Sequence, residues 1–580
     1  MLSNEPYAAI FTTPTEAWGF AEPCGSVTAW NHDEIDATFA EAASQTERGL
    51  HAMGFVAYDA APAFDSAFRA HRDPSMPLAH FAFFRARAPL RFAVEAPSTP
   101  AAAWTPLIDE AGYLAALAEI RRGIGAGDTY QVNFTFPLEA PFSGDPHAWF
   151  HALREAQGGG YCALLSTDTH TILSASPELF FHLRRGRIVT RPMKGTRPRA
   201  LWPAADRLQR DALRASEKDR AENIMIVDMM RNDLGRICET GSVEAPEQFS
   251  IEQYPTVWQM TSTVTGKTRA SVPEIFRALF PSASITGAPK VAAMNFIHAL
   301  ERHPRGLYCG AIGYWSPGQE ACFNVAIRTL TVDHNRGVAR YAVGSGVTWD
   351  SAAKSEYLEC LDKARILTHR LPAFELLETL RHDGSFFLLE GHIARLLASA
   401  AYFQFSFDEA TVLCALKNAL NLECAAPARV RITLARNGVI TAAAVPLAPA
   451  GPWRLGLAVY PVSRDHLFLY HKTTHRQCYQ DALATRPDCD DVLLWNDDGE
   501  LTESCIGNLV LQIDGQWRTP PIAAGLLGGV FRAALLEAGE IREARLTVED
   551  LNRATAIRLI NSVREWWTPL WVDMPAPAPR

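Results

Sequence analysis

The sequence lacks the features that would place this chain on nucleic acid, in a membrane or in an oxidising compartment. The net charge is -9 and lysine and arginine form no block, so there is no basic stretch to attract a polyanion. No apolar run reaches the roughly 18–20 residues of a membrane span, and the first residues, MLSNEPYAAIFTTP, do not resemble a signal peptide. The 11 cysteines are scattered without a CxxC pair, which indicates reduced thiols and argues against zinc. We expect a cytoplasmic protein that binds neither nucleic acid nor membrane.

Length and composition predict several folded domains. The chain has 580 residues, of which 48% are hydrophobic and 21% charged, as in soluble globular proteins. Since domains usually span roughly 100–200 residues, we expect two or three cores. Residues 96–106, APSTPAAAWTP, predict a surface loop, and a helical pattern stops at the proline of residues 368–374, THRLPAF. These breaks predict three parts, at residues 1–105, 106–371 and 372–580.

Two pairs of acidic residues have helical spacing. Asp219 and Glu222 lie three residues apart in one amphipathic segment, and Glu356 and Glu359 repeat that spacing in another. Magnesium binds oxygen ligands and typically takes one or two carboxylates, so two such pairs could supply a site. Each pair taken alone is more often a solvated helix face, and spacing by itself does not establish a metal site.

Eight motifs in a fixed order give stronger evidence. Within about residues 110–370 they are SASPELFF, RPMKGTRPR, AENIMIVDMMRNDLGRI, SASITGAPK, GAIGYW, FNVAIRTL, VGSGVTWD and SEYLECLDKA. In this order they resemble the chorismate-binding enzymes, which include anthranilate synthase, aminodeoxychorismate synthase component I, and the isochorismate and salicylate synthases. The resemblance implies an α+β multidomain protein whose N-terminal half is an α/β sandwich that binds chorismate and Mg²⁺.

Two positions separate the chemistries within this family. Lys194 of RPMKGTRPR stands where anthranilate synthases carry a small residue, and it resembles the lysine of aminodeoxychorismate synthases. The resemblance implies that its neutral amine attacks chorismate while Glu178 protonates the departing hydroxyl, which requires a lysine pKa below the usual value of about 10.4. Gln131 of TYQVNF replaces the lysine that activates water in isochorismate and salicylate synthases. Both residues argue against the alternative of an anthranilate- or salicylate-forming half.

The resemblance also implies the contacts to metal and substrate. Glu222 and Glu359 would hold Mg²⁺, with Asp219 and Glu356 as outer partners. Arg328 and Tyr314 would bind the enolpyruvyl carboxylate, because a planar guanidinium suits bidentate pairing. The full set of implied substrate contacts is Ser284, Tyr314, Arg328, Gly346 and Lys363.

Some features of related enzymes are absent from this sequence. Gln259 replaces a usual histidine, which puts a proton-transfer role there in doubt, and Ala283 replaces a common glycine. No cysteine lies in a G-x-C-x-G elbow, so we expect ammonia from a separate glutamine amidotransferase subunit or from solution. No LLES-like segment resembles the tryptophan site of anthranilate synthases, and we expect no feedback by tryptophan.

A second series of motifs begins at Phe374. In order they are FELLETLRHDGSFFLLEGHIARLLASAAYF, HKTTHR, GELTESCIGNLV, TPPIAAGLLGGVFR and LINSVREWW. They resemble the fold-type IV pyridoxal-phosphate enzymes, which include branched-chain and D-amino acid aminotransferases and aminodeoxychorismate lyase. The resemblance implies a two-subdomain α+β fold that binds pyridoxal 5'-phosphate, and it suggests a homodimer through this domain.

Each motif of this series has a role that the cofactor requires. By resemblance, Lys472 would bond to the cofactor and move a proton, and Glu503 would pair with the pyridine nitrogen. Arg395 and the backbone N–H groups of Val530 and Phe531 would bind the phosphate, since glycines and a helix start favour anions. Alternatives for this part are an aminotransferase and a non-catalytic interaction module.

The two resemblances name consecutive reactions. The product of amination, 4-amino-4-deoxychorismate, carries the free amine that the second part could bind. The hypothesis from sequence is therefore a bifunctional enzyme that converts chorismate and ammonia to p-aminobenzoate, a folate precursor.

Overall fold

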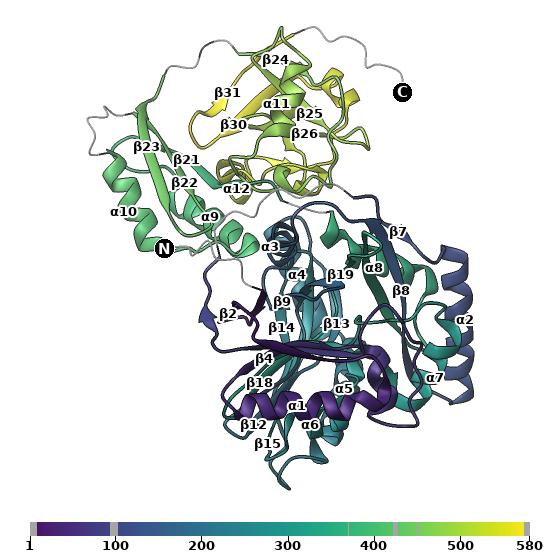
Figure 1. Ribbon diagram of the computed structural model, residues 1–580. Helices are drawn as coiled ribbons and strands as arrows, with labels where there is room; N and C mark the ends of the chain where they lie inside the picture. The colour runs from purple at the N-terminus through teal and green to yellow at the C-terminus, as the bar shows by residue number, and fades with distance from the viewer. Residues whose placement is uncertain are drawn as a thin grey trace. The chain divides into compact units, whose positions relative to one another are not determined.

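The computed structural model divides the chain into two units (Figure 1). Unit 1 comprises residues 1–199 and 209–371, and unit 2 comprises residues 200–208 and 372–580. The residues that the structure describes are 8–92, 102–368, 371–420, 427–448, 451 and 453–572. Most of the loop expected at residues 96–106 lies outside them, and the three-part division stays a prediction. No helix in these ranges is long and apolar enough to cross a membrane.

Unit 1 contains two ten-stranded sheets in which each strand pairs antiparallel with its neighbours. The first has the order β16 (Gly287–Ala288), β8 (Gln131–Pro141), β20 (Val338–Val347), β19 (Thr329–Asp333), β10 (His170–Ser176), β9 (Tyr161–Ser166), β1 (Ala9–Thr12), β2 (Ala17–Phe20) and β6 (Ala88–Pro89), with β7 (Thr105–Pro106) paired to β8. The second has the order β13 (Met193–Pro198), β15 (Val257–Lys267), β12 (Arg187–Arg191), β11 (Leu179–Arg184), β18 (Glu320–Val325), β17 (Ala311–Ser316), β4 (His51–Val56), β5 (Ala79–Phe84) and β3 (Gly25–Ala29), with β14 (Glu244–Gln253) paired to β15.

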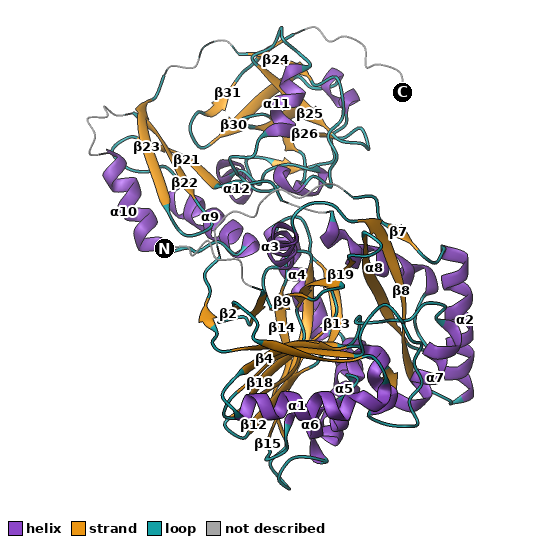
Figure 2. Cartoon of the chain, in the orientation of Figure 1, coloured by secondary structure: helices purple, strands orange, loops and turns teal. Residues whose placement is uncertain are grey.

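The two sheets share an apolar core. Phe11 and Phe20 of the first sheet pack in one cluster with Phe55 and Phe84 of the second. Helices cover the outer faces, as Figure 2 shows. Those on the first sheet are α2 (Glu110–Ala126), α3 (Pro146–Gln157), α7 (Lys290–Leu300) and α8 (Ala353–Ala364), and those on the second are α1 (Ile35–Glu47), α5 (Glu217–Gly235) and α6 (Val272–Leu279). The expected α/β sandwich is confirmed.

Local sequence explains where the site-bearing helices begin. The side chain of Ser216 accepts a hydrogen bond from the backbone of Asp219, so it caps α5 one turn before the acidic residues. Helix α2 starts at the cap Asp109 and ends at Gly127, whose φ of 83° is a left-handed conformation that glycine adopts without strain. The helix α4 (Pro203–Ala215) precedes α5 in the chain. The Ser216 cap fixes where α5 begins, so Asp219 and Glu222 lie within its first two turns.

Unit 2 has two subdomains, as expected. The smaller has the sheet β21 (Leu376–His382), β22 (Ala428–Leu434) and β23 (Ile440–Pro446), with helices α9 (Leu389–Phe403) and α10 (Glu409–Leu420). The larger has the sheet β29 (Arg542–Glu543), β28 (Gln516–Thr519), β27 (Asn508–Ile513), β26 (Leu501–Ser504), β25 (Asp491–Trp495), β24 (Arg454–Leu457) and β32 (Leu570–Trp571), joined by β30 (Ala556–Asn561) and β31 (Glu565–Trp567), with helices α11 (Gln477–Ala484) and α12 (Val530–Glu537). The helix predicted from GHIARLLASAAYFQF and the strand predicted from ARVRITLA are α9 and β22.

Two candidate active sites

A buried carboxyl group marks the first candidate site. Glu178 lies between β10 and β11 and is 3% exposed. Burial raises its pKa to about 7, although a hydrogen bond from the Ser284 hydroxyl and the nearby Lys194 act in the opposite direction. A carboxyl with a pKa near neutrality holds its proton for part of the time, so Glu178 can act as a proton donor.

Lys194 projects from β13 into the same cavity, which has a volume of about 310 Å³. A Cβ atom on Gly346 would lie 2.4 Å from Lys194 Nζ, so this amine occupies space that only a glycine leaves free. Burial lowers the pKa of Lys194, and the neighbouring Lys363 adds to this effect, while Glu222 opposes it. The shift favours the neutral amine that a nucleophile needs.

Four carboxylates from two distant helices line this cavity. Helix α5 contributes Asp219 and Glu222, and α8 contributes Glu356 and Glu359. Among the described residues, no three histidine, cysteine, aspartate or glutamate side chains are close enough to hold a metal together. The pairs still fit magnesium, because this ion commonly takes one or two protein carboxylates and completes its shell with water and substrate oxygens.

Cationic side chains flank the carboxylates, among them Lys218, which lies 3.9 Å from Glu222. Lys363 Nζ lies 2.7 Å from Glu359 Oε1 and donates to the Gly344 carbonyl at 2.9 Å, so its charge is partly satisfied within α8 and β20. Arg328 also lines the cavity and donates to the Gln157 amide oxygen. No carboxylate of the described part of the chain pairs with Arg328. A partly buried guanidinium in this state favours an anionic ligand.

The tyrosine predicted to bind the enolpyruvyl carboxylate does not reach the cavity. The hydroxyl of Tyr314 donates to Glu320 at 3.2 Å, and its ring packs on Phe11 with centroids 5.4 Å apart, inside the core between the sheets. Tyr308 instead forms part of the cavity wall. The sequence analysis missed it, and the available signal was a second tyrosine six residues earlier in the same segment, RGLYCGAIGYW.

The two glutamines singled out in the sequence lie beside Lys194. Gln259 accepts from the Thr196 hydroxyl and donates to the Gly195 carbonyl, both at 2.8 Å, so it fixes the strand that carries Lys194. Gln131 is fully buried, and its side-chain amide has no hydrogen-bond partner among the described residues. A Cβ atom on Gly346 would lie 2.8 Å from Gln131 Nε2. An orphaned buried amide at this point is what a polar ligand would satisfy.

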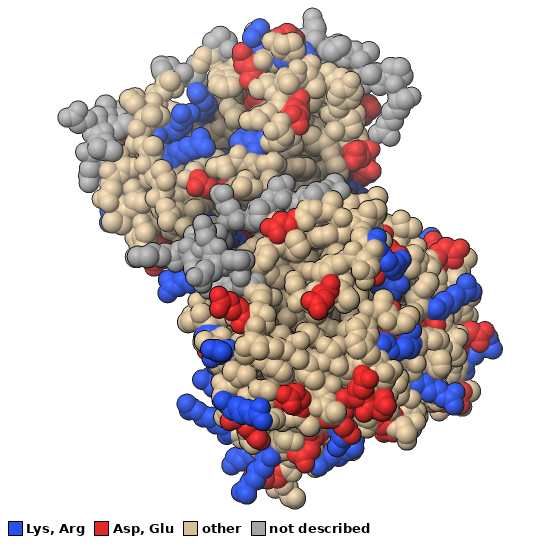
Figure 3. All heavy atoms as spheres, viewed as in Figure 1, with Lys and Arg blue, Asp and Glu red and all other residues tan. Residues whose placement is uncertain are grey.

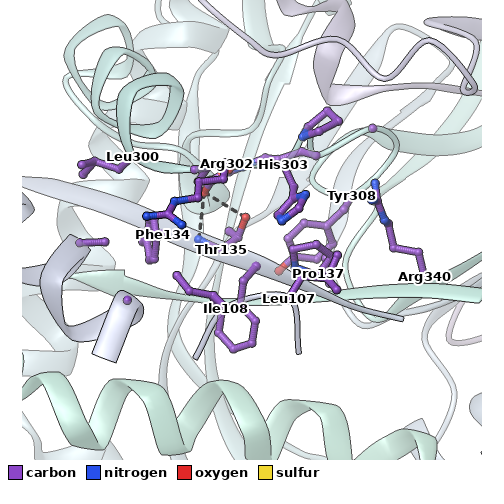
Figure 4. Close-up of a pocket in the computed structure, with 18 of the residues that line it drawn as sticks. Leu107, Ile108, Phe134, Thr135, Pro137, Leu300, Arg302, His303, Tyr308 and Arg340 are labelled. Carbon is purple, nitrogen blue, oxygen red and sulfur yellow. Dashed lines mark hydrogen bonds and ion pairs between the residues drawn. The ribbon is translucent and has the colours of Figure 1, made fainter. Parts of the chain in front are cut away.

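A larger cavity of about 780 Å³ lies against β8 and the 299–308 segment (Figure 4). It shares Tyr308 and Ala342 with the first candidate site but contains neither Lys194 nor its carboxylates. The buried pair Glu301 and Arg305 forms part of its wall, with a shortest N–O distance of 2.8 Å. Arg305 also donates to the backbone carbonyls of Ile285 at 3.1 Å and Asn133 at 2.6 Å. This pair therefore holds the segment that carries Ser284.

The second candidate site lies in unit 2, in a cavity of about 410 Å³. Burial lowers the pKa of Lys472 to about 8, and Arg395 adds to the shift. Burial raises the pKa of Glu503 to about 7. Glu503 accepts from the Leu527 backbone at 3.1 Å, the Tyr479 hydroxyl at 2.8 Å and the Asn508 amide at 3.2 Å, which fixes its orientation. An amine and an acid with these shifts are equipped to move protons near neutral pH.

Residues at one end of this cavity fit a phosphate group. Arg395 is held by Glu378 at 2.7 Å and donates to the Gly528 carbonyl at 3.1 Å. Helix α12 starts at Val530, so its first N–H groups are available to an anion. The side chain of Phe531 packs in the core, and only its backbone N–H belongs to the expected site.

His392 is a cavity residue that the sequence analysis missed. Its Nδ1 atom contacts Glu378 at 2.7 Å, whereas Nε2 is buried without a partner among the described residues. An orphaned ring nitrogen beside Arg395 is consistent with a bound anion. The available signal was its position three residues before the arginine in GHIARL.

Comparison with known proteins gives the same division. Residues 86–369 match the family model described as chorismate binding enzyme, and residues 373–568 match that of amino-transferase class IV. Unit 1 therefore contains a chorismate-binding-enzyme domain and unit 2 contains a class IV aminotransferase domain, a domain type that binds pyridoxal phosphate.

Particular relatives match unit 1. Aminodeoxychorismate synthase component 1 of Klebsiella aerogenes is 42% identical over 280 residues, which cover 48% of this chain and 62% of that protein. Anthranilate synthase component 1 3 of Haloarcula marismortui is 38% identical over 279 residues, which cover 48% of this chain and 54% of that protein. The chain thus spans less than two thirds of the length of these relatives. Anthranilate synthase component I from Streptococcus pneumoniae TIGR4 has the same fold, with a TM-score of 0.53, 24% identity, and coverage of 64% of this chain and 94% of that one.

Proposed function

We propose that the chain makes p-aminobenzoate from chorismate in two steps, amination in unit 1 and elimination of pyruvate in unit 2. The observation that carries the proposal is the position of Lys194, whose amine points past Gly346 into a cavity that also holds Glu178 and four carboxylates. An aminodeoxychorismate synthase component 1 is among the similar proteins, which supports amination at C4.

The geometry of unit 1 supports covalent catalysis by Lys194. Its neutral amine attacks C2 of chorismate, both ring double bonds shift toward C4, and the C4 hydroxyl leaves as water with a proton from Glu178. Ammonia then forms a bond to C4 and gives up a proton to the ionised Glu178, both double bonds shift back, and Lys194 leaves C2 with the electron pair of its bond. The free cation of Arg328 would hold the enolpyruvyl carboxylate together with Tyr308.

The carboxylates of α5 and α8 would hold magnesium. Glu222 and Glu359 are the ligands that we propose, with Asp219 and Glu356 as outer partners. When bound, the ion supplies positive charge against the ring carboxylate of chorismate. Ser284 and Lys363 complete the polar wall, and Gly346 leaves the space that the amine needs.

We propose that ammonia reaches unit 1 from a separate glutamine amidotransferase subunit. The relative from Klebsiella carries the name component 1, and no segment of this chain has an amidotransferase nucleophile elbow. Ammonium salts should therefore support the reaction of the isolated chain, while glutamine alone should not.

In unit 2, pyridoxal phosphate supplies an electron sink when it is bound. Arg395, His392 and the N–H groups of Val530 and Phe531 would hold its phosphate, and Glu503 would keep its ring nitrogen protonated. Lys472 would remove the proton at C4 of the aminated intermediate. The electron pair of that C–H bond then makes the ring aromatic as the C3–O bond breaks and pyruvate leaves as its enol.

One incubation tests the proposal. The chain is mixed with chorismate, Mg²⁺, pyridoxal phosphate and ammonium, and the aromatic product is identified. We expect p-aminobenzoate. Formation of anthranilate would contradict the amination proposed for unit 1, and amino-group transfer to a 2-oxo acid would contradict the elimination proposed for unit 2.

A pair of variants then tests the metal site. Glu222→Gln should abolish chorismate consumption and leave the absorption band of the bound cofactor unchanged. Asp228→Asn, on an exposed part of α5, is the matched control and should change neither. Loss of the cofactor band in folded Glu222→Gln would contradict the assignment of metal and cofactor to separate sites.

A further inference from the structure

The cavity that contains Lys472 carries an excess of positive charge. Six cationic side chains of the described residues line it, and Glu503 is the one carboxylate among those lining residues. The six are Arg395, Arg429, Arg431, Lys472, Arg476 and Arg564. Figure 3 shows basic side chains gathered around a hollow on this face of unit 2. A concentration of positive charge around a cavity attracts anions.

Three of the six cations already have a task. Arg395 is paired with Glu378, Lys472 is the proposed base, and Arg476 donates to the Cys505 carbonyl and lies over the Tyr479 ring at 4.3 Å. Arg429, Arg431 and Arg564 remain. None of the three pairs with a carboxylate of the described chain, and Arg564 contacts the Trp453 ring at 5.6 Å.

The strand β22 presents two of these arginines on its exposed face. Arg429 and Arg431 are two residues apart, so they project from the same face of the sheet. The residue directly opposite Arg429 on β21 is Arg381, and the residue opposite Arg431 is Thr379. Arg381 pairs with Glu565, whereas no carboxylate within the described residues pairs with Arg429 or Arg431. The two guanidinium groups therefore have donors available for an anion in the cavity that they line.

We propose that Arg429, Arg431 and Arg564 bind the two carboxylates of the unit 2 substrate, and so make the site selective for a dicarboxylate amine over a monocarboxylate amino acid. The inference rests on the proposed function, because the aminated chorismate carries one carboxylate on its ring and one on its enolpyruvyl ether. Arginine suits this task, since its planar donors match a carboxylate in pairs. The phosphate and the two carboxylates then account for four of the six cations, Arg395, Arg429, Arg431 and Arg564.

Two stable compounds test whether the second carboxylate contributes to binding. In 3-(carboxymethoxy)benzoate, a ring carboxylate and an ether-linked carboxylate stand in the same meta relationship as in the substrate, whereas 3-methoxybenzoate lacks the second carboxylate. Binding of each to the cofactor-loaded chain is measured by titration calorimetry for wild type and for Arg429→Gln, Arg431→Gln and Arg564→Gln. All three substitutions lie in unit 2. A difference in affinity from wild type therefore reports binding in unit 2 and not in unit 1.

We expect each substitution to weaken binding of the dicarboxylate by about 10- to 100-fold, as for a lost hydrogen bond to a charged group, and to affect the monocarboxylate less. The KM for supplied aminodeoxychorismate should rise similarly, with a smaller change in kcat. Arg464→Gln is the control, because this exposed arginine pairs with Asp498 and does not line the cavity. An unchanged cofactor absorption band shows that each variant is folded.

Equal binding of the dicarboxylate to wild type and all three variants would overturn the inference, and so would an equal loss for both compounds. The calorimetric result is independent of turnover. If wild type converted no aminodeoxychorismate while dicarboxylate binding still depended on the three arginines, the proposed function would fail and the dicarboxylate site would stand.

Discussion

The hydroxyl of Ser284 donates a hydrogen bond to the carboxyl group of Glu178 at a point where both side chains are buried. The two residues are 106 positions apart in the chain, and Ser284 lies in a short 3-10 helix, Ala283–Ile285. Burial raises the pKa of Glu178 and the hydroxyl lowers it, so the pair balances the protonated against the ionised form. A proton donor for chorismate must be protonated before the reaction and able to ionise during it.

Removal of the Ser284 hydroxyl should change the pH dependence of amination. If Glu178 acts as the acid, kcat/KM falls as pH rises through its pKa, because the ionised form cannot donate. Ser284→Ala removes a donor to the carboxylate, which raises this pKa further and moves the falling limb to higher pH. The profile is measured from chorismate consumption at constant free ammonia. Ser282→Ala, which removes a hydroxyl that contacts Ser284 but not Glu178, should move the limb less. A limb that moves to lower pH would contradict the assignment.

Tyr308 and Tyr314 should differ in their effect on chorismate binding. Tyr308→Phe should raise the KM for chorismate, because Tyr308 lines the cavity and we propose that it helps to hold the enolpyruvyl carboxylate. Tyr314→Phe should leave KM unchanged and lower the stability by about 1 kcal/mol, since it loses a hydrogen bond to Glu320 in the core. Steady-state kinetics and the thermal midpoint measure the two effects. The reverse pattern would restore Tyr314 to the substrate site.

His392 should contribute to cofactor affinity. Its buried Nε2 atom lacks a partner, and a phosphate would supply one, so His392→Gln should weaken pyridoxal phosphate binding by about tenfold. Equilibrium dialysis of the cofactor-free chain gives the dissociation constant without reference to activity. His382→Gln on β21, outside the cavity, is the control. Equal affinity of wild type and His392→Gln would mean that the orphaned nitrogen serves another purpose.

The buried pair Glu301 and Arg305 should show strong coupling in stability. Arg305→Met leaves the buried carboxyl group of Glu301 without its ionic partner and should cost about 3–5 kcal/mol. The double variant Glu301→Leu with Arg305→Met removes both charges, so we expect it to be more stable than Arg305→Met alone. Thermal unfolding midpoints of unit 1 compare the three forms. A double variant less stable than the single one would mean that Glu301 contributes mainly through Thr135.

The sequence predicted much of both sites, because local patterns place their residues. Helical spacing placed the acidic pairs of α5 and α8 correctly on one face each, and the alternation of β22 predicted its buried and exposed sides. The convergence of α5 and α8 depends on sheet pairing between distant segments, such as Asn133 of β8 with Gly346 of β20, which no local pattern reports. The motif led us to expect Tyr314 at the cavity, because a sequence motif does not report on which face of a strand a side chain lies. In the structure, the Tyr314 ring of β17 packs in the core. His392 was missed because a lone histidine on an apolar helix face is usually structural.

Lys194→Ala and Lys472→Ala should stop the pathway at different points. Lys194→Ala loses the nucleophile, so it should leave chorismate largely unconsumed but still convert supplied aminodeoxychorismate to p-aminobenzoate. Lys472→Ala loses the base, so it should consume chorismate and accumulate aminodeoxychorismate. Loss of such a group commonly costs several orders of magnitude in rate, at about 1.4 kcal/mol for each tenfold, so chromatography of the three compounds separates the cases.

A mixture of the two variants should form p-aminobenzoate, since each supplies the step that the other lacks. Lys267→Ala, an exposed lysine on β15, is the control and should behave as wild type. Normal p-aminobenzoate output from Lys194→Ala would exclude covalent catalysis by that lysine, and normal output from Lys472→Ala would exclude the elimination in unit 2. A mixture that stayed inactive while each variant kept its own half-reaction would instead mean that the intermediate does not pass through solution, because complementation requires it to leave one chain and enter another.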